Sequence, residues 1–296
     1  MPKIALIGPL SKDRVIKENM MHKSAGGPVY YQSSVMKSLK INVSALITLS
    51  KSDKTLLKEF GKNIEIIPSF RNKTIEFQNI YPTDDPDFRI QKANIPCNPI
   101  TVEDMMDFNL EDVEVILLGP LCPYDIPLET IEFLSKFNIP LYLGAQGYLR
   151  HLKGDEIVLS PWNDFKKFLK FIKILFLDEN EAKIILDEDI SLTETAKILA
   201  SFGPEEVIIT CGSHGAVIYS KKLDKTYKIP AFKADHVVDP TGLGDMFMAA
   251  YSVRKLEIED PEECGIFAAA AAAIKLEKNG PFRENRDLIE EKMKIS

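Results

Sequence analysis

The stretch from residue 237 to residue 251 constrains the fold of this chain more than any other. It passes from an apolar strand end through an Asp-Pro turn, contains two glycines spaced one residue apart, and continues as a helix-compatible run with small alanines. Such a turn brings free backbone N–H groups and the positive end of a helix dipole to one point, where a phosphate group is stabilised. Gly242 and Gly244 carry no Cβ, so a ligand can approach the backbone closely. We therefore expect an anion site at this turn.

Asp245 is the unusual residue of this turn, because a carboxylate repels the anion that the turn would hold. As a structural residue it would cap the start of the helix, a position that Asp favours. As a functional residue it would be a general base that takes a proton from an attacking hydroxyl, while the neighbouring N–H groups hold the transferring phosphoryl group. The turn alone supports both interpretations about equally.

Residues 239–245 read Asp-Pro-Thr-Gly-Leu-Gly-Asp and resemble the signature of the ribokinase-like (PfkB) carbohydrate kinases, whose usual form is Asp-Thr-x-Gly-Ala-Gly-Asp. Pro240 replaces the usual Thr and Leu243 the usual Ala. The resemblance implies an α/β fold with a ribokinase-like three-layer αβα core, a mainly parallel sheet and a small inserted β lid. It implies a catalytic base at the last residue of the signature and an anion hole from the backbone N–H groups around it: Gly242, Leu243, Gly244 and Asp245.

The composition fits one or two globular α/β domains, because 296 residues with 45% hydrophobic side chains can bury a sizeable core. The net charge of −7 gives no support for nucleic-acid binding. The Lys-rich residues 165–173 fit an amphipathic helix with a solvated face. The four cysteines are scattered and indicate neither a zinc site nor disulfides. We expect no signal peptide, because a strand is predicted already at residues 4–7. The longest apolar run, 264–274, is too short to cross a bilayer. We expect a cytoplasmic protein without nucleic-acid or membrane partners.

Strands and helices alternate along most of the chain, which predicts a parallel sheet with right-handed crossovers. The predicted strands are residues 4–7, 43–49, 64–67, 113–119, 140–144 and 173–177, with helices at 28–39, 52–60 and 128–137. Residues 73–93 break this rhythm, because two segments with period-two alternation flank a turn-rich stretch.

This interruption has two interpretations, a lid or an edge hairpin of the main sheet. Ribokinase-like enzymes have a lid that closes over the acceptor and often forms a dimer contact, and the resemblance therefore favours a lid. We assign it to about residues 10–24 and 69–97 of a single domain spanning 1–296. The same resemblance allows a homodimer formed through the lid.

The amino-terminal motifs concern the acceptor. Asp13 stands where the kinase family commonly has an Asp that accepts hydrogen bonds from substrate hydroxyls, although the residue by itself fits a surface loop as well. Gly26 and Gly27 precede a helix with Pro in its first turn and resemble the Gly-Gly motif that lies against the sugar. Tyr31 stands where most members have Asn, so a phenol and not an amide would contact the hydroxyls of the substrate.

Gln146 and Arg150 follow a predicted strand end, which is where ligands bind in open α/β sheets. Residues 146–150, the two tyrosines after the Gly-Gly motif, and residues 279–283 together resemble the family members that phosphorylate myo-inositol. The resemblance therefore implies myo-inositol as the preferred acceptor. A nucleoside, a furanose or a ketose sugar stays open as the alternative.

A strand followed by an acidic helix start at Asp178 and Glu181 is ordinary capping chemistry. In the family this place carries Asn-x-x-Glu, whose Glu organises water around the magnesium of the nucleotide. The resemblance implies this role for Glu181, with Asp178 in place of the Asn. It also allows a monovalent cation beside Asp239 and Thr241, as in some relatives.

Residues 207–219 read as two strands joined by a tight turn and resemble the nucleotide loop Thr-x-Gly-x-x-Gly. The resemblance makes Thr210, Gly212 and Gly215 ATP contacts. His214 lies in the same turn, where we expect it to point to solvent or to the edge of the nucleotide and not to act as a base.

The sequence thus predicts an ATP- and Mg²⁺-dependent kinase that phosphorylates a hydroxyl of a small polyol or sugar, most of all myo-inositol, with a nucleoside kinase or a fructokinase- or ribokinase-type sugar kinase as the alternative. A Rossmann oxidoreductase is disfavoured, because no Gly-x-Gly-x-x-Gly follows the first strand. An inactive sensor is disfavoured by Asp245 and the two signature glycines. The exact acceptor, the donor and the oligomeric state stay open.

Overall fold

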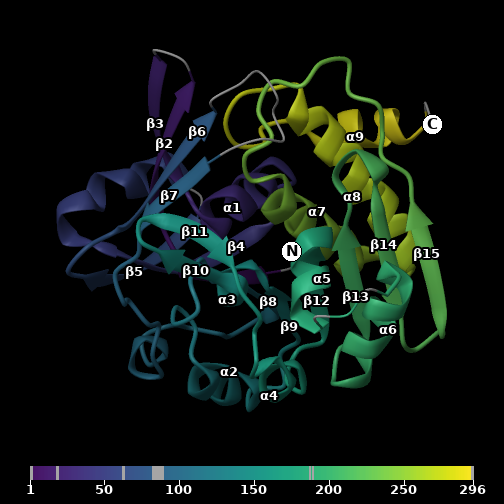
Figure 1. The fold of residues 1–296 in the computed structure, drawn as a ribbon, viewed down its shortest axis with the longest axis horizontal. Helices are drawn as coiled ribbons and strands as arrows, with labels where there is room; N and C mark the ends of the chain where they lie inside the picture. Colours follow the sequence, from purple (N-terminus) through teal and green to yellow (C-terminus); the bar gives the residue numbers. More distant parts are fainter. Residues whose placement is uncertain are drawn as a thin grey trace.

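The computed structural model describes residues 3–17, 20–61, 64–81, 90–186, 188 and 190–294. These residues form a large sheet covered by helices on both faces and a separate, smaller sheet beside it (Figure 1). The α/β class and the mainly parallel main sheet predicted from the alternation of strands and helices are confirmed.

The main sheet has nine strands in the order β15-β14-β13-β12-β9-β8-β1-β4-β5. All neighbours from β13 to β5 pair in parallel, and β14 and β15 extend the sheet as antiparallel strands. Their bounds are β1 (Lys3–Pro9), β4 (Asn42–Ser50), β5 (Ile64–Arg71), β8 (Val113–Leu118), β9 (Leu141–Gly144), β12 (Ile174–Asp178), β13 (Glu206–Thr210), β14 (Ala216–Ser220) and β15 (Lys225–Ile229).

Each face of the main sheet packs against its own set of helices, because successive strand residues point to opposite faces. In β1, Ile4 and Leu6 join one hydrophobic cluster and Ala5 and Ile7 join the other. The first cluster includes residues of α1 (Pro28–Ser38), α7 (Leu243–Glu257), α8 (Pro261–Leu276) and α9 (Arg286–Met293). The second includes residues of α2 (Leu128–Ser135), α3 (Gln146–Leu149), α4 (Phe165–Leu169), α5 (Glu179–Leu186) and α6 (Leu192–Ser201).

The smaller sheet has six strands in the order β10-β11-β7-β6-β2-β3. Its bounds are β2 (Ser11–Lys17), β3 (Met20–Gly26), β6 (Ile75–Tyr81), β7 (Ile90–Asn94), β10 (Arg150–Lys153) and β11 (Glu156–Leu159). The two period-two segments are β6 and β7, which pair antiparallel as predicted. An edge hairpin of the main sheet is wrong for them, because β6 also pairs with β2. Closure of this sheet over a ligand stays a prediction.

The structure differs from the sequence expectation in three local features. Residues 52–60, expected as a helix without regard to its type, form a helix of the tighter 3₁₀ kind, η1 (Lys51–Phe60). The Lys-rich helix is short, since α4 ends at Leu169, but its buried and exposed sides match the amphipathic prediction. The hairpin formed by β10 and β11 was not predicted. Within the described part of the chain, no helix combines the length and apolar character needed to cross a bilayer.

Candidate active site

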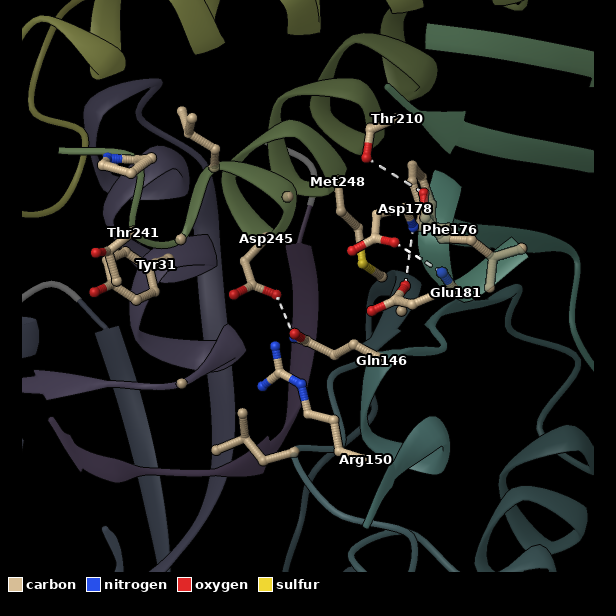
Figure 2. A pocket seen from close by; sticks show the side chains of 18 of the residues that line it. Tyr31, Gln146, Arg150, Phe176, Asp178, Glu181, Thr210, Thr241, Asp245 and Met248 are labelled. Atoms are coloured by element: carbon tan, nitrogen blue, oxygen red, sulfur yellow. Dashed lines mark hydrogen bonds between the residues drawn. The ribbon is translucent and has the colours of Figure 1, made fainter. Parts of the chain in front are cut away.

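A cavity of about 380 Å³ lies where the carboxyl ends of β9, β12 and β13 meet the smaller sheet (Figure 2). Ligand pockets of this size are typical of small-molecule sites. The cavity brings together most of the residues singled out from the sequence: Asp13, Gly27, Tyr31, Gln146, Arg150, Asp178, Glu181, Thr210, Gly212, Thr241, Gly242, Leu243, Gly244 and Asp245. Gly26, Gly215 and Asp239 do not line it.

Asp245 stands in the first turn of α7 and points toward Gln146 (Figure 2). The Gln146 amide Nε2 donates a hydrogen bond of 3.1 Å to Oδ1 of Asp245. Burial raises the pKa of Asp245 to about 7; the Asp13 carboxylate adds to this increase, while Arg150 and the Gln146 hydrogen bond oppose it. A carboxylate that titrates near neutral pH is well matched to taking up a proton during a reaction.

The turn before α7 has a left-handed glycine at the cap of the helix, as expected for the glycine turn. Gly242 adopts a left-handed conformation with φ 75°, and Met246 N donates the first hydrogen bond of the helix to the Gly242 carbonyl, at 2.9 Å. The preceding first-turn N–H groups have no acceptor within the helix, although Leu243 N makes a long contact of 3.4 Å to the Pro240 carbonyl. A Cβ atom on Gly242 would lie closer than 3.0 Å to the Tyr31 ring, so only glycine lets the turn pack against this ring.

The smaller sheet supplies polar groups to one side of the cavity. Ser11 Oγ donates a hydrogen bond of 2.7 Å to Asp13 Oδ1 in β2. Gly26 in β3 lies against the same carboxylate, and a Cβ atom there would clash with it, so Gly26 makes room for Asp13 without lining the cavity itself. Asn79 and Gln91 line the cavity from β6 and β7, and Gln91 Nε2 donates to Asn79 Oδ1 at 2.8 Å. The sequence analysis missed this amide pair, whose strand pattern does not reveal which face meets a ligand.

Arg150 is a cation among carboxylates at this side of the cavity. Its guanidinium carbon lies 5.9 Å from the centre of the Phe77 ring. Its charge lowers the pKa of both Asp245 and Glu181 against the larger effect of burial. Arg150 therefore favours the ionised form of the buried acids and offers a donor to an anionic or hydroxylic ligand.

Asp178 and Glu181 cap the start of α5 reciprocally. Asp178 Oδ1 accepts hydrogen bonds of 2.8 Å from the backbone N–H groups of Asn180 and Glu181, and the Asp178 N–H donates to Glu181 Oε2 at 2.9 Å. Burial raises the pKa of Glu181 to about 8, with Asp178 and Asp245 adding to the increase. The ordinary capping interpretation is thus correct for the geometry, and both side chains also line the cavity.

These carboxylates fit a hydrated magnesium ion. A divalent cation stabilises the ionised form of a buried acid whose neighbours are also acids, and Mg²⁺ retains several water ligands when it binds proteins. Among the described residues, no group of three or more His, Cys, Asp or Glu side chains is arranged to enclose a metal directly. Contact through water from Glu181 is the mode that this donor set supports.

Two of the three predicted nucleotide contacts at the end of β13 line the cavity, and the third does not. Thr210 and Gly212 line the cavity, and the position of a Cβ atom on Gly212 is open, with nothing within 4 Å. Gly215 lies outside the cavity and packs against the backbone of Ile229, which an added Cβ atom would meet. Glycine is therefore required here for the turn and not for contact with a ligand. His214 is exposed and outside the cavity, as expected for a side chain that points to solvent.

Asp239 is enclosed by donors from its own protein. Its Oδ1 accepts from Thr241 N at 2.9 Å and its Oδ2 from Gly280 N at 3.0 Å. The Lys275 ammonium group donates to the Asp239 carbonyl at 2.7 Å and lies 3.3 Å from Oδ2. This arrangement does not fit a monovalent cation between Asp239 and Thr241. The sequence analysis missed Lys275, whose signal is a single charge near the end of an alanine-rich apolar helix.

The sequence of this chain is similar to those of known kinases. The sequence profile described as pfkB family carbohydrate kinase matches residues 147–286. A nucleoside kinase of Methanocaldococcus jannaschii is 42% identical over 76 residues, which are 26% of this chain and only 24% of that protein. A cytidine kinase of Thermococcus kodakarensis is 30% identical over 223 residues, covering 74% of this chain and 73% of that protein.

The fold also matches solved structures. One of them, described as a pyrophosphate-dependent kinase in the ribokinase family complexed with a pyrophosphate analog and myo-inositol, superposes with a TM-score of 0.83. It covers 97% of this chain and 99% of its own chain at 23% sequence identity, which establishes the ribokinase-like fold. Together with the cytidine kinase that is 30% identical over 73% of its own length, these matches show that the chain belongs to the pfkB family of carbohydrate kinases, which are phosphotransferases.

Proposed function

We propose that this protein is a kinase that transfers the γ-phosphoryl group of ATP to a hydroxyl of a small polyol, with myo-inositol as the preferred acceptor. The observation that carries the proposal is the position of Asp245. A carboxylate with a pKa raised to about 7 stands in the first turn of α7, beside a glycine turn shaped for an anion and hydrogen-bonded to Gln146.

In this mechanism Asp245 takes the proton of the attacking acceptor hydroxyl as the new O–P bond forms, and the bond from phosphorus to the leaving group breaks. The first-turn N–H groups of Gly242, Leu243 and Gly244 hold the negative oxygens of the transferring group. Glu181 would hold magnesium through water, and when bound the ion would neutralise charge on the donor phosphates. Thr210 and Gly212 line the cavity, which supports them as contacts of the donor.

The polar side of the cavity supports a polyol acceptor. Asp13, Gln146 and Arg150 combine carboxylate, amide and guanidinium groups, which together can donate to and accept from several ring hydroxyls. Phe77 lines the cavity but is only 3% exposed and has Arg150 over its ring, so little of the ring is open for a base to stack on. The myo-inositol complex of the structurally similar kinase supports the same acceptor.

A nucleoside is the second candidate acceptor, because the 30% identical relative is a cytidine kinase. Pyrophosphate is the second candidate donor, because the structurally similar kinase is described as pyrophosphate-dependent. Both alternatives keep Asp245 as the base and change only what the two ends of the cavity bind.

An acceptor and donor panel tests the proposal. We expect the highest kcat/KM for myo-inositol with ATP and Mg²⁺, compared with cytidine, adenosine, ribose and fructose, and with pyrophosphate in place of ATP. Each deoxy-inositol should lose roughly tenfold in kcat/KM, because a buried partner is left unpaired at about 1 to 3 kcal/mol.

Phosphorus NMR of the products identifies the phosphorylated compound. If kcat/KM for cytidine or ribose is at least roughly tenfold higher than for myo-inositol, the acceptor assignment is wrong, while the kinase proposal stays valid. Higher activity with pyrophosphate would replace the donor. If none of the acceptor and donor pairs gives a phosphorylated product, the proposal as a whole is wrong.

The pH dependence of kcat/KM should report the ionisation of Asp245. Because its pKa is raised to about 7, the ionised fraction and kcat/KM fall as the pH falls through about 7 and level off above it. Gln146→Ala removes a hydrogen bond that lowers this pKa, so the midpoint should move to higher pH.

The matched control is Gln91→Ala, which removes a cavity amide that is hydrogen-bonded to Asn79 and should leave the midpoint in place. A profile of kcat/KM that stays flat between about pH 6 and pH 8 would speak against Asp245 as the base.

A further inference from the structure

Lys275 is a charged side chain inside the core. It stands in the last turn of α8, follows the alanine run of that helix, and is 2% exposed. Its ammonium group reaches the turn that precedes α7, where it contacts the carbonyl and the carboxylate of Asp239 at 2.7 and 3.3 Å. A fully buried lysine is rare unless it is paired, so this contact needs an explanation beyond packing.

The surrounding backbone ties the same two segments together. Val238 N donates to the Leu276 carbonyl at 2.8 Å, and Gly280 N donates to Asp239 Oδ2 at 3.0 Å. Thr241 N completes the set at Oδ1, at 2.9 Å. The end of α8 therefore holds the Asp-Pro turn from one side, directly before the glycine turn at the start of α7.

The charges of the pair balance. Burial lowers the pKa of Lys275, and the Asp239 carboxylate opposes this by favouring the ammonium form. Burial also acts to raise the pKa of Asp239, but Lys275 and the N–H donors outweigh it and lower that pKa below its usual value. Asp239 is thus ionised at neutral pH, and the positive charge beside it stabilises that form.

We propose that the Lys275 ammonium group is a built-in cation that holds the Asp239 turn, and with it the anion hole, so that this protein requires no added monovalent cation. The sequence had allowed such an ion beside Asp239 and Thr241. Its charge is already supplied there by the protein, and a second cation would be repelled by the ammonium group. Lys275 is a positioning residue, since it contacts Asp239 and not the cavity.

The catalytic part of this proposal rests on the proposed kinase function, and its thermal part does not. For the unaltered protein we expect the same Tm, and kcat/KM within roughly twofold, in KCl, NaCl and choline chloride of equal ionic strength, because a ligand that does not bind the folded state cannot stabilise it. A Tm raised by K⁺ relative to choline would overturn the proposal, whether or not an acceptor has been found. A kcat/KM roughly tenfold lower in choline would overturn it as well.

Lys275→Met removes the charge and keeps most of the side-chain length. In choline chloride this variant should melt at a lower temperature and lose roughly 10²-fold in kcat, because a displacement of about 1 Å at the reacting groups has an effect of that size. K⁺ or NH₄⁺ should then raise its Tm and restore part of its kcat, since a small ion can occupy the place that the ammonium group has left.

The matched control is Lys255→Met. Lys255 forms another ion pair, partly buried, to Glu206 at 2.6 Å, away from the cavity. This variant should also melt at a lower temperature, but equally in KCl and choline chloride. If Lys275→Met behaves in the same way, with no response specific to K⁺ or NH₄⁺, Lys275 is a structural residue and the proposal is wrong.

Discussion

Asp245→Asn is expected to lower kcat by roughly 10² to 10⁴-fold, because general-base assistance contributes about that much and an amide cannot take up the proton. The affinity for ATP should stay within a few-fold of the original, since Asn keeps the size of the side chain at the start of α7. Steady-state kinetics with the preferred acceptor and calorimetric ATP binding measure the two quantities separately.

The same substitution should not unfold the protein. Burial raises the pKa of Asp245 to about 7, above the value of about 3.9 expected for Asp in an unfolded chain. Ionisation of Asp245 therefore opposes folding increasingly as the pH rises from about 4 to about 7, and this opposition is absent at low pH. Asp245→Asn should melt at a higher temperature than the unaltered protein near pH 8 and at the same temperature near pH 4. If kcat of Asp245→Asn is close to that of the unaltered protein, Asp245 is not the base.

Gly242→Ala is expected to lower kcat by roughly 10²-fold or more, the scale of effect seen when oxyanion donors are displaced. The glycine has φ 75°, which disfavours any other residue, and an added Cβ would lie closer than 3.0 Å to the Tyr31 ring. That ring is 6% exposed and has little room to move. The turn must shift instead, and its N–H groups shift with it. Kinetics and thermal melting together measure the effect.

Two comparisons separate the clash from the backbone strain. Gly154→Ala introduces the same kind of strain, at φ 69°, with nothing within 4 Å of the new Cβ atom, and should leave kcat almost unchanged. In a Tyr31→Ala background, Gly242→Ala should cost less than it does alone, because the atoms that it meets are gone. An undiminished loss in that background would show that contact with Tyr31 is not the cause.

Local patterns in the sequence predicted the core and the most specific part of the site. The alternation of apolar strands and helices predicted the parallel sheet, because side-chain periodicity is a property of each segment by itself. The glycine turn and Asp245 were recognisable for the same reason, since the backbone conformation of Gly242 and the start of α7 are encoded within a few residues. The period-two pattern of β6 and β7 likewise predicted their antiparallel pairing.

Only the tertiary structure decided which distant groups meet. The smaller sheet combines strands from three separate parts of the chain, so the membership of β10 and β11 follows from tertiary contacts and not from their local sequence. Gln146 and Asp245 are 99 residues apart, and Lys275 and Asp239 are 36 residues apart. The raised pKa values of Asp245 and Glu181 arise mainly from burial, which no single segment possesses. Residue type and spacing determine local conformation, whereas the distances and solvent exposure that set the chemistry of a site are produced by packing between segments.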